Sequence, residues 1–197
     1  DKISIEKVFM ENDIYAIIHC ATNYGHNTSK LNVFNTNLSF PIELLSLANN
    51  YNVGFFINTD TFLNRKISPY SLSKKHFIEW AYQFSNDKIQ IINVIMHHVY
   101  GPNDKDFKFI KTIFTKFKNN VDSIKLTDGN QKRDFIYIDD AANAFSVILK
   151  NLENIQVNVF EIATNTNTSV KELVLLMKEI SKNTNTILDF GALKYRE

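Results

Sequence analysis

The chain has 197 residues, of which 44% are hydrophobic and 22% are charged, and its formal net charge is +1. This is the composition of a globular protein, and the near-neutral charge excludes a global field that would attract nucleic acid or anionic membrane. No stretch approaches the ~20 consecutive apolar residues that a membrane span requires, so we expect a cytoplasmic protein. The single cysteine, Cys20, excludes an internal disulfide and a multi-cysteine metal site, and its apolar flanks favour a buried position.

In the first half of the chain, apolar runs of strand length alternate with helix-like segments. Each run is short, continuous and bounded by polar residues, which is typical of a strand buried on both faces. Such an alternation predicts a parallel sheet with helices on its faces. The predicted strands cover residues 16–21, 54–58 and 89–96, and the predicted helices cover residues 40–47 and 69–84.

After Gly101-Pro102 the pattern changes to a basic, aromatic helix and several short strands. Ser169 and Glu172 have the spacing of a capping box, which predicts a helix start. The apolar stripe behind them is expected to pack in a core: Val170, Leu173, Val174, Met177 and Ile180. The other predicted elements are a helix over residues 106–119 and strands over 124–126, 134–138 and 157–162.

Tyr70 and Lys74 are four residues apart, directly after Pro69 at a predicted helix start. On a helix this spacing places both side chains on one face. A tyrosine has an ordinary pKa of about 10, and a neighbouring ammonium favours the phenolate, so we expect Lys74 to lower the pKa of Tyr70. Such a pair can exchange a proton with a sugar hydroxyl or ketone while a cofactor exchanges the hydride.

The strand before this helix ends in Thr59, Asp60 and Thr61, which bring two hydroxyls and a carboxyl to its carboxyl end. Open parallel sheets place their ligands at this end of the strands. His97 and His98 are adjacent and diverge on a strand, so we expect no metal site there.

The order of several segments resembles the extended short-chain dehydrogenase/reductases, which epimerise, dehydrate or reduce nucleotide sugars. These segments are IIHCATNYG, NTNL, FFINTDT, YSLSK, HVYGP and RDFIYIDDAANA. The resemblance implies an α/β fold with a Rossmann-like, doubly wound parallel sheet and a small C-terminal substrate-binding lobe. Residues 1–102 would then be a partial dinucleotide-binding domain, and residues 103–197 a mixed region with the substrate-binding lobe and returning Rossmann elements.

The resemblance also implies roles for single residues near the reaction centre. Tyr70 and Lys74 match the catalytic pair, and Thr59 matches the residue that bonds the reacting oxygen of the sugar. Asp60 belongs to the same catalytic stretch. The cofactor is expected to be NAD or NADP, and the residues expected beside it are Ala21, Thr22, Asn37, Tyr70 and Lys74.

For the substrate, the resemblance implies a nucleotide-diphosphate sugar. Arg133 and Arg196 match arginines that hold the diphosphate, a task that suits a guanidinium because it can donate two parallel hydrogen bonds. His98 is expected to contact the sugar or the nicotinamide amide. A homodimer is a further expectation, through residues of the helix that carries the tyrosine: Phe77, Ile78, Trp80, Ala81 and Phe84.

Relatives carry a glycine-rich turn, GxxGxxG, whose backbone amides hold the cofactor pyrophosphate at a helix start. This sequence contains no such motif. We therefore expect the N-terminal glycine-rich βα unit to be absent from this chain.

Thr61 bears on the type of reaction. The sugar-nucleotide 4,6-dehydratases of the family read Thr-Asp-Glu at this stretch, and a hydroxyl at the third position cannot act as a carboxylate base, so dehydration is disfavoured. The short connection from Thr59 to Tyr70 resembles the CDP-abequose synthase group, which reduces 4-keto-6-deoxyhexose nucleotides for surface polysaccharides. The alternatives are an NAD-dependent nucleotide-sugar 4-epimerase and a non-catalytic cofactor-binding scaffold.

Overall fold

The computed structural model describes residues 2–84 and 88–195, and the chain divides into two compact units. Unit 1 contains residues 1–96 and 145–162, and unit 2 contains residues 97–144 and 163–197. The units alternate along the chain because the segment 145–162 returns to unit 1. This division differs from the contiguous ranges 1–102 and 103–197 that the sequence suggests.

Unit 1 is built on a four-stranded sheet in the order β1-β2-β3-β7, in which all neighbouring strands are parallel. The register pairs Asn58 of one strand with Asn93 of the next. Parallel pairing is the arrangement that the alternation of strands and helices predicts. The strands are β1 (Ala16–His19), β2 (Phe55–Thr61), β3 (Gln90–Met96) and β7 (Val159–Ile162).

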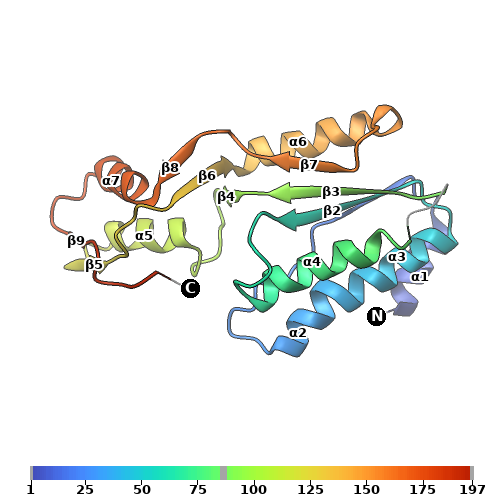
Figure 1. Cartoon of the computed structure of the whole chain (residues 1–197), viewed down its shortest axis with the longest axis horizontal. Helices are drawn as coiled ribbons and strands as arrows, with labels where there is room; N and C mark the ends of the chain where they lie inside the picture. The colour runs from blue at the N-terminus through green and yellow to red at the C-terminus, as the bar shows by residue number, and fades with distance from the viewer. Residues whose placement is uncertain (1, 85–87, 196–197) are drawn as a thin grey trace. The chain divides into compact units, whose positions relative to one another are not determined.

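Helices lie on both faces of this sheet, as a doubly wound fold requires (Figure 1). The helices α3 (Phe40–Asn50) and α4 (Pro69–Ala81) cover one face, and residues 145–150, the part of α6 (Ile138–Lys150) that belongs to unit 1, lie on the other. The remaining helical elements are α1 (Lys2–Glu11), α2 (Lys30–Phe34), the π-helix η1 (Asn35–Ser39) and the 3-10 helix η2 (Leu152–Asn154). The expected Rossmann-like fold is confirmed.

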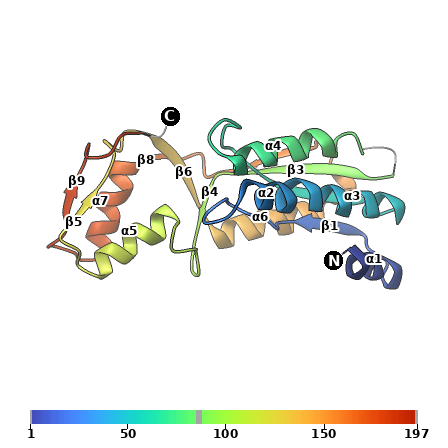
Figure 2. The ribbon, with the colours of Figure 1, turned by 90° about the horizontal axis from the view of Figure 1, so that it is seen from below.

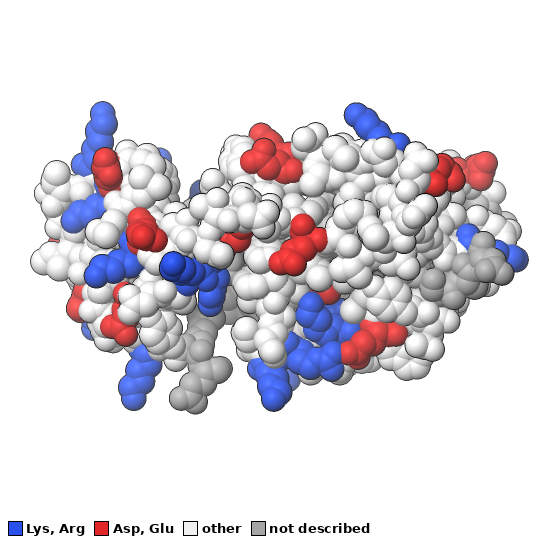
Figure 3. Space-filling view, turned by 45° about the horizontal axis from the view of Figure 1, so that its top comes forward, with Lys and Arg blue, Asp and Glu red and all other residues white. Residues whose placement is uncertain are grey.

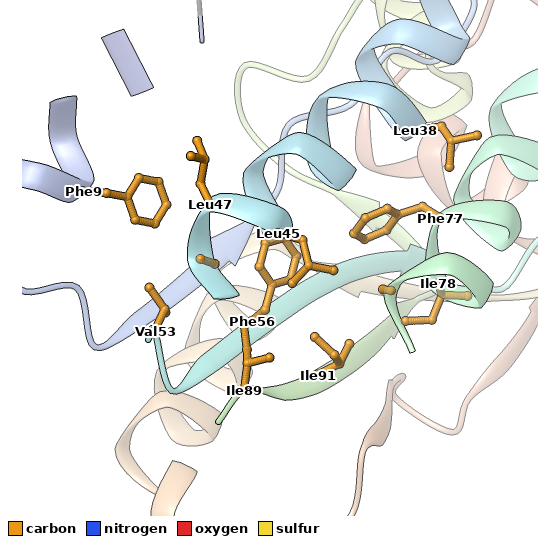
Figure 4. Packing of buried hydrophobic residues seen from close by; sticks show 12 residues of the cluster. Phe9, Leu38, Leu45, Leu47, Val53, Phe56, Phe77, Ile78, Ile89 and Ile91 are labelled. Carbon is orange, nitrogen blue, oxygen red and sulfur yellow. The ribbon is translucent and has the colours of Figure 1, made fainter. Parts of the chain in front are cut away.

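The main core of unit 1 lies between the sheet and the helices α3 and α4 (Figure 4). Phe56 of β2 and Phe77 of α4 are fully buried, with ring centroids 6.0 Å apart. Burial of each such side chain stabilises the fold by about 1.5–3 kcal/mol. This packing fixes the rotation of α4, and it therefore also buries Lys74, which precedes Phe77 and Ile78 by three and four residues on the same face.

Most of the residues suggested as dimer contacts belong to this core. Phe77, Ile78 and Ala81 are buried in it, and Phe84 packs against it. Trp80 differs, because 56% of its surface is exposed.

Unit 2 combines small sheets with two packed helices, α5 (Phe109–Lys118) and α7 (Val170–Ile180), which lie beside β5 and β9 (Figure 2). The expected capping box at Ser169 and Glu172 is confirmed. Val170, Val174 and Met177 enter the core and Leu173 packs against it, whereas Ile180 is exposed, contrary to expectation. The strands are β4 (His98–Tyr100), β5 (Ser123–Lys125), β6 (Lys132–Tyr137), β8 (Asn167–Ser169) and β9 (Ile187–Asp189).

The face drawn in Figure 3 carries basic and acidic residues in small, interspersed groups, in keeping with the net charge of +1. Within the described residues, no helix has the length and apolar character needed to cross a membrane.

Candidate active site

The carboxyl end of β2 brings polar groups to the edge of an otherwise apolar strand. The Thr59 hydroxyl donates a hydrogen bond to the His19 carbonyl of β1, at 3.0 Å. Thr61 is buried, and its side chain is hydrogen bonded to Tyr70. The ends of β1 and β2 and the start of α4 thus come together at the side of the sheet where ligands bind in this class of fold.

Local sequence fixes the start of α4. The Ser68 hydroxyl accepts a hydrogen bond from the Ser71 amide, and the Ser71 hydroxyl accepts one from the Ser68 amide, both at 3.1 Å. Pro69 occupies the first turn, where its missing N–H is no loss. This reciprocal cap places Tyr70 in the first turn and Lys74 one turn later.

Tyr70 is half-buried, and its ring lies 5.0 Å from the ring of Tyr24, centroid to centroid. Burial raises the pKa of Tyr70 well above its ordinary value of 10, and the charges of Tyr24 and Asp60 act in the same direction. The hydrogen bond with Thr61 lowers the pKa only in part. The expectation that Lys74 lowers the pKa of Tyr70 is therefore wrong for this structure, and the phenol is protonated at neutral pH.

Lys74 is only 2% exposed, and its Nζ has no hydrogen-bond partner among the described residues. Burial lowers the pKa of Lys74 to about 8, against the raising effects of Asp60 and Cys20. A buried ammonium without acceptors is costly, and sugar hydroxyl oxygens are suitable acceptors for it. The site therefore fits the ribose of a nicotinamide cofactor at Lys74.

Asn37 connects the loop after β1 to α4. Its side chain is fully buried, accepts hydrogen bonds from the Asn23 amide (2.7 Å) and the Thr22 hydroxyl (3.4 Å), and donates to the Ser73 hydroxyl (3.0 Å). Asn37 lies in the π-helix η1, an irregularity that often marks functional sites. The structure thus brings together Asn37, Thr22 and α4, while Ala21 lies exposed on the same loop.

Cys20 directly follows β1, and its side chain is exposed. The expectation that it is a buried packing residue is wrong, because β1 ends at His19 and the chain leaves the sheet there. His19 itself is buried in the core, at 3% exposure. Burial and the charge of Lys74 lower the pKa of His19 to about 4, so this histidine is neutral.

Asp60 belongs to a buried network that the motif search does not anticipate. Its carboxylate oxygen Oδ2 accepts hydrogen bonds from Lys75 Nζ and from Asn93 Nδ2, each at 3.0 Å. Asn93 in turn accepts from Asn58 Nδ2, at 2.8 Å. The sequence does show polar residues within apolar strands. It does not show that they contact one another, because that depends on the sheet register, which pairs Asn58 with Asn93.

The residues expected to bind the substrate lie in unit 2. His98 of β4 packs against Phe135 of β6, with ring centroids 5.4 Å apart. Burial, followed by the charges of Arg133 and His97, lowers the pKa of His98 to about 4. Arg133 is half-buried on the same neighbouring strand as Phe135, and Arg196 lies outside the described residues. The structure therefore brings His98 and Arg133 together.

Comparison with known proteins identifies relatives over the whole chain. The model of the NAD dependent epimerase/dehydratase family matches residues 1–163. The CDP-abequose synthase of Salmonella typhimurium is 34% identical over 100% of this chain and 69% of the relative. That of Salmonella muenchen is 35% identical over 98% of this chain and 69% of the relative.

Solved structures agree on the fold. The UDP-glucose 4-epimerase of Thermotoga maritima, determined with UDP-glucose, superimposes with a TM-score of 0.79 at 21% identity. The match covers 99% of this chain and 73% of that protein. At this identity the likeness establishes the fold.

Proposed function

This chain belongs to the NAD dependent epimerase/dehydratase family, and from this premise we propose that it reduces a 4-keto-6-deoxyhexose nucleotide with NADH or NADPH. Family membership confirms the expected nicotinamide cofactor and the enzyme class, that of the extended short-chain dehydrogenase/reductases that modify nucleotide sugars. Two relatives named CDP-abequose synthase, 34% and 35% identical to this chain, support the narrower proposal, and so does the resemblance of residues 59–70 to the same group.

The single observation that carries the proposal is the position of Tyr70, which the capped start of α4 holds at the end of β2, hydrogen bonded to the Thr61 side chain. Burial raises the pKa of its phenol, and the neutral phenol is the form that can deliver a proton. Reduction of a ketone requires such a donor at the carbonyl oxygen, and the cofactor supplies the hydride when bound. We propose that the Thr59 hydroxyl, which donates to the His19 carbonyl in this structure, exchanges that bond for one to the same oxygen when the sugar binds.

Lys74 and Asn37 prepare the site for the cofactor. The Lys74 ammonium, which has no hydrogen-bond partner within residues 2–84 and 88–195, is proposed to donate hydrogen bonds to the ribose hydroxyls. Asn37 holds the loop that carries Ala21 and Thr22 beside α4. The proposed cofactor contacts therefore depend on the buried amide of Asn37, which connects this loop to α4.

Thr61 argues against dehydration at this site. Its hydroxyl is hydrogen bonded to Tyr70 and accepts from the Leu63 amide at 3.3 Å. A hydroxyl in these bonds is no substitute for a carboxylate that removes a proton at neutral pH. The remaining chemistry is hydride and proton transfer, which serves a reductase and a 4-epimerase alike.

We propose that the nucleotide diphosphate is bound by Arg133 and Arg196 and that neutral His98 contacts the sugar. A guanidinium is permanently charged and donates in a fork, which suits diphosphate oxygens. A neutral imidazole can accept a hydrogen bond from a sugar hydroxyl with one nitrogen and donate one with the other.

The test is to incubate the full-length protein with NADH or NADPH and a 4-keto-6-deoxyhexose nucleotide and to follow the absorbance of the reduced cofactor. The proposal predicts stoichiometric loss of reduced cofactor, and Tyr70→Phe provides the inactive control. Interconversion of two hexose nucleotides without net cofactor consumption would establish the epimerase instead. Cofactor binding without turnover of any nucleotide sugar would indicate the scaffold.

A further inference from the structure

A line of buried polar side chains runs across the first three strands of the sheet. His19 Nδ1 lies 3.4 Å from Asn58 Oδ1, Asn58 Nδ2 donates to Asn93 Oδ1, and Asn93 Nδ2 donates to Asp60 Oδ2. All four side chains are at most 4% exposed. Since both amides donate toward Asp60, the chain of hydrogen bonds ends on its carboxylate.

The two oxygens of Asp60 accept hydrogen bonds from three different groups. Oδ1 accepts from the Thr61 amide at 2.7 Å, and Oδ2 accepts from Asn93 and from Lys75. A protonated carboxyl would direct its own hydrogen at one of these donors, so the geometry selects the carboxylate. As a carboxylate, Asp60 has no proton to donate to the sugar.

Lys75 clamps α4 to the end of β2. Its Nζ forms an ion pair with Asp60 and also donates to the Thr61 carbonyl, and its side chain is 22% exposed. Lys74, the preceding residue on the helix, is buried and has no partner at Nζ among the described residues. Asp60 thus acts electrostatically on two ammonium groups, and of these two described lysines Lys75 is the one that contacts it directly.

The groups that act electrostatically on Lys74 come from three elements. They are His19 and Cys20 at the end of β1, Asp60 on β2 and Lys75 on α4. His19 is neutral, Lys75 is a cation, and the Cys20 thiol is weakly acidic. Among these described groups, Asp60 is the one that is an anion at neutral pH.

Resting on the proposed function, we propose that Asp60 is a positioning residue and not a proton donor. Its carboxylate, held by Lys75, Asn93 and the Thr61 amide, is the fixed counter-charge that keeps the buried Lys74 ammonium charged. The buried amides of Asn58 and Asn93 serve the same end because they hold Asp60 in place. This role would explain why Asn58 and Asn93 occur within otherwise apolar strands.

The proposal predicts shifts of opposite sign for two substitutions. Asp60→Asn removes the anion and leaves two cations, so Lys74 should lose its proton at a pH about one unit or more lower. Lys75→Met removes the competing cation, so Lys74 should lose its proton at a higher pH. Damage to the fold alone has no reason to produce this reversal.

Lysine-selective ¹⁵N NMR of the full-length protein, titrated with and without NAD, measures these shifts directly. The Lys74 signal is assigned by its loss in Lys74→Arg. Asp13→Asn is the matched control, because Asp13 is an exposed aspartate that precedes β1 at the end remote from the site. Lys75→Met keeps the test decisive if Asp60→Asn does not fold.

Activity gives a second readout on the same variants. If Asp60 sustains the charge of Lys74, lower pH should restore the kcat of Asp60→Asn toward that of the wild type. Loss of activity at every pH, with an unchanged Lys74 titration, would overturn the proposal. The titration needs no sugar substrate, so absent turnover in the wild type counts against the proposed function alone.

Discussion

Lys74 combines deep burial with an amine that lacks a hydrogen-bond partner among the described residues. A spacing of four residues from Tyr70 predicts a shared helix face, and the structure adds that the face is the one carrying Phe77 and Ile78 into the core. A motif search finds the lysine but not its desolvation, because burial depends on how α4 packs. Burial of this charge destabilises the fold, and the proposed contact with the cofactor ribose would explain why the lysine is present.

We expect Lys74→Met to raise the free energy of unfolding at pH 7 by roughly 1–3 kcal/mol, because it removes a poorly paired buried charge. The folded pKa of Lys74 is about 8, and its ordinary value is 10.5. The penalty is therefore complete below pH 8 and disappears as the pH rises toward 10.5. Denaturant unfolding of the wild type and of Lys74→Met at several pH values measures this penalty. A Lys74→Met variant that is less stable than the wild type at pH 7 would contradict the prediction.

His19 predicts an acid-sensitive fold. Its pKa is about 4 in the folded protein and ordinarily 6.5, so the unfolded chain binds the proton more tightly. Stability is complete above pH 6.5 and falls as the pH drops toward 4, by up to roughly 3 kcal/mol from this residue. His19→Leu should flatten the curve of unfolding free energy against pH between pH 4 and pH 6.5, even if the substitution also shifts the whole curve up or down. An unchanged slope would show that His19 is not the responsible group.

At the scale of elements, the strands β1, β2 and β3 and the helix α4 agree with the predicted segments to within a few residues at their ends. Each is a continuous apolar run or a capped helix whose signal is local. The π-helix η1 is not predicted, because nothing in the residues 35–39 marks the extra residue in its turn. The π-helix contains Asn37, whose hydrogen-bond partners Asn23 and Ser73 are distant in sequence. These contacts can be seen only in the folded structure.

Asn37→Ala tests the importance of that element. The substitution removes the acceptor of the part-buried Asn23 amide and the donor to the Ser73 hydroxyl, so we expect a loss of about 2 kcal/mol in unfolding free energy and weaker cofactor binding. Asn32→Ala is the matched control, since Asn32 is exposed and its side chain donates to the Thr28 hydroxyl of the same exposed loop. Equal effects of the two substitutions, measured by thermal unfolding and cofactor titration, would refute this role.

At the scale of the whole molecule, the order of short motifs was enough to predict the fold and family. The motifs are individually weak, but their sequence along the chain is specific, and the family match over residues 1–163 confirms it. The polar network of Asp60 escapes such a search. It exists only because the sheet register and α4 bring residues 19, 58, 60, 75 and 93 together.

Because the surface charge is mixed, we propose that single residues such as Arg133 bind the diphosphate. We expect Arg133→Ala to raise the KM for the nucleotide sugar on the order of tenfold, with a smaller change in kcat, because diphosphate contacts are made equally in the ground and transition states. Lys132→Ala, a change of the same charge on the neighbouring exposed residue, should have less effect. Steady-state kinetics decides, and equal KM values for both variants would contradict the assignment.

The central claim is that the Tyr70 phenol delivers a proton to a keto oxygen while hydride reaches the carbon. Single turnover with reduced cofactor deuterated at the transferred position, followed by NMR of the sugar, tests it most directly. The account predicts one deuterium at C4 and one oxidised cofactor per sugar, with Tyr70→Phe slower by a factor of about 10²–10⁴. Deuterium that remains on the cofactor after turnover, or a Tyr70→Phe rate equal to that of the wild type, would contradict it.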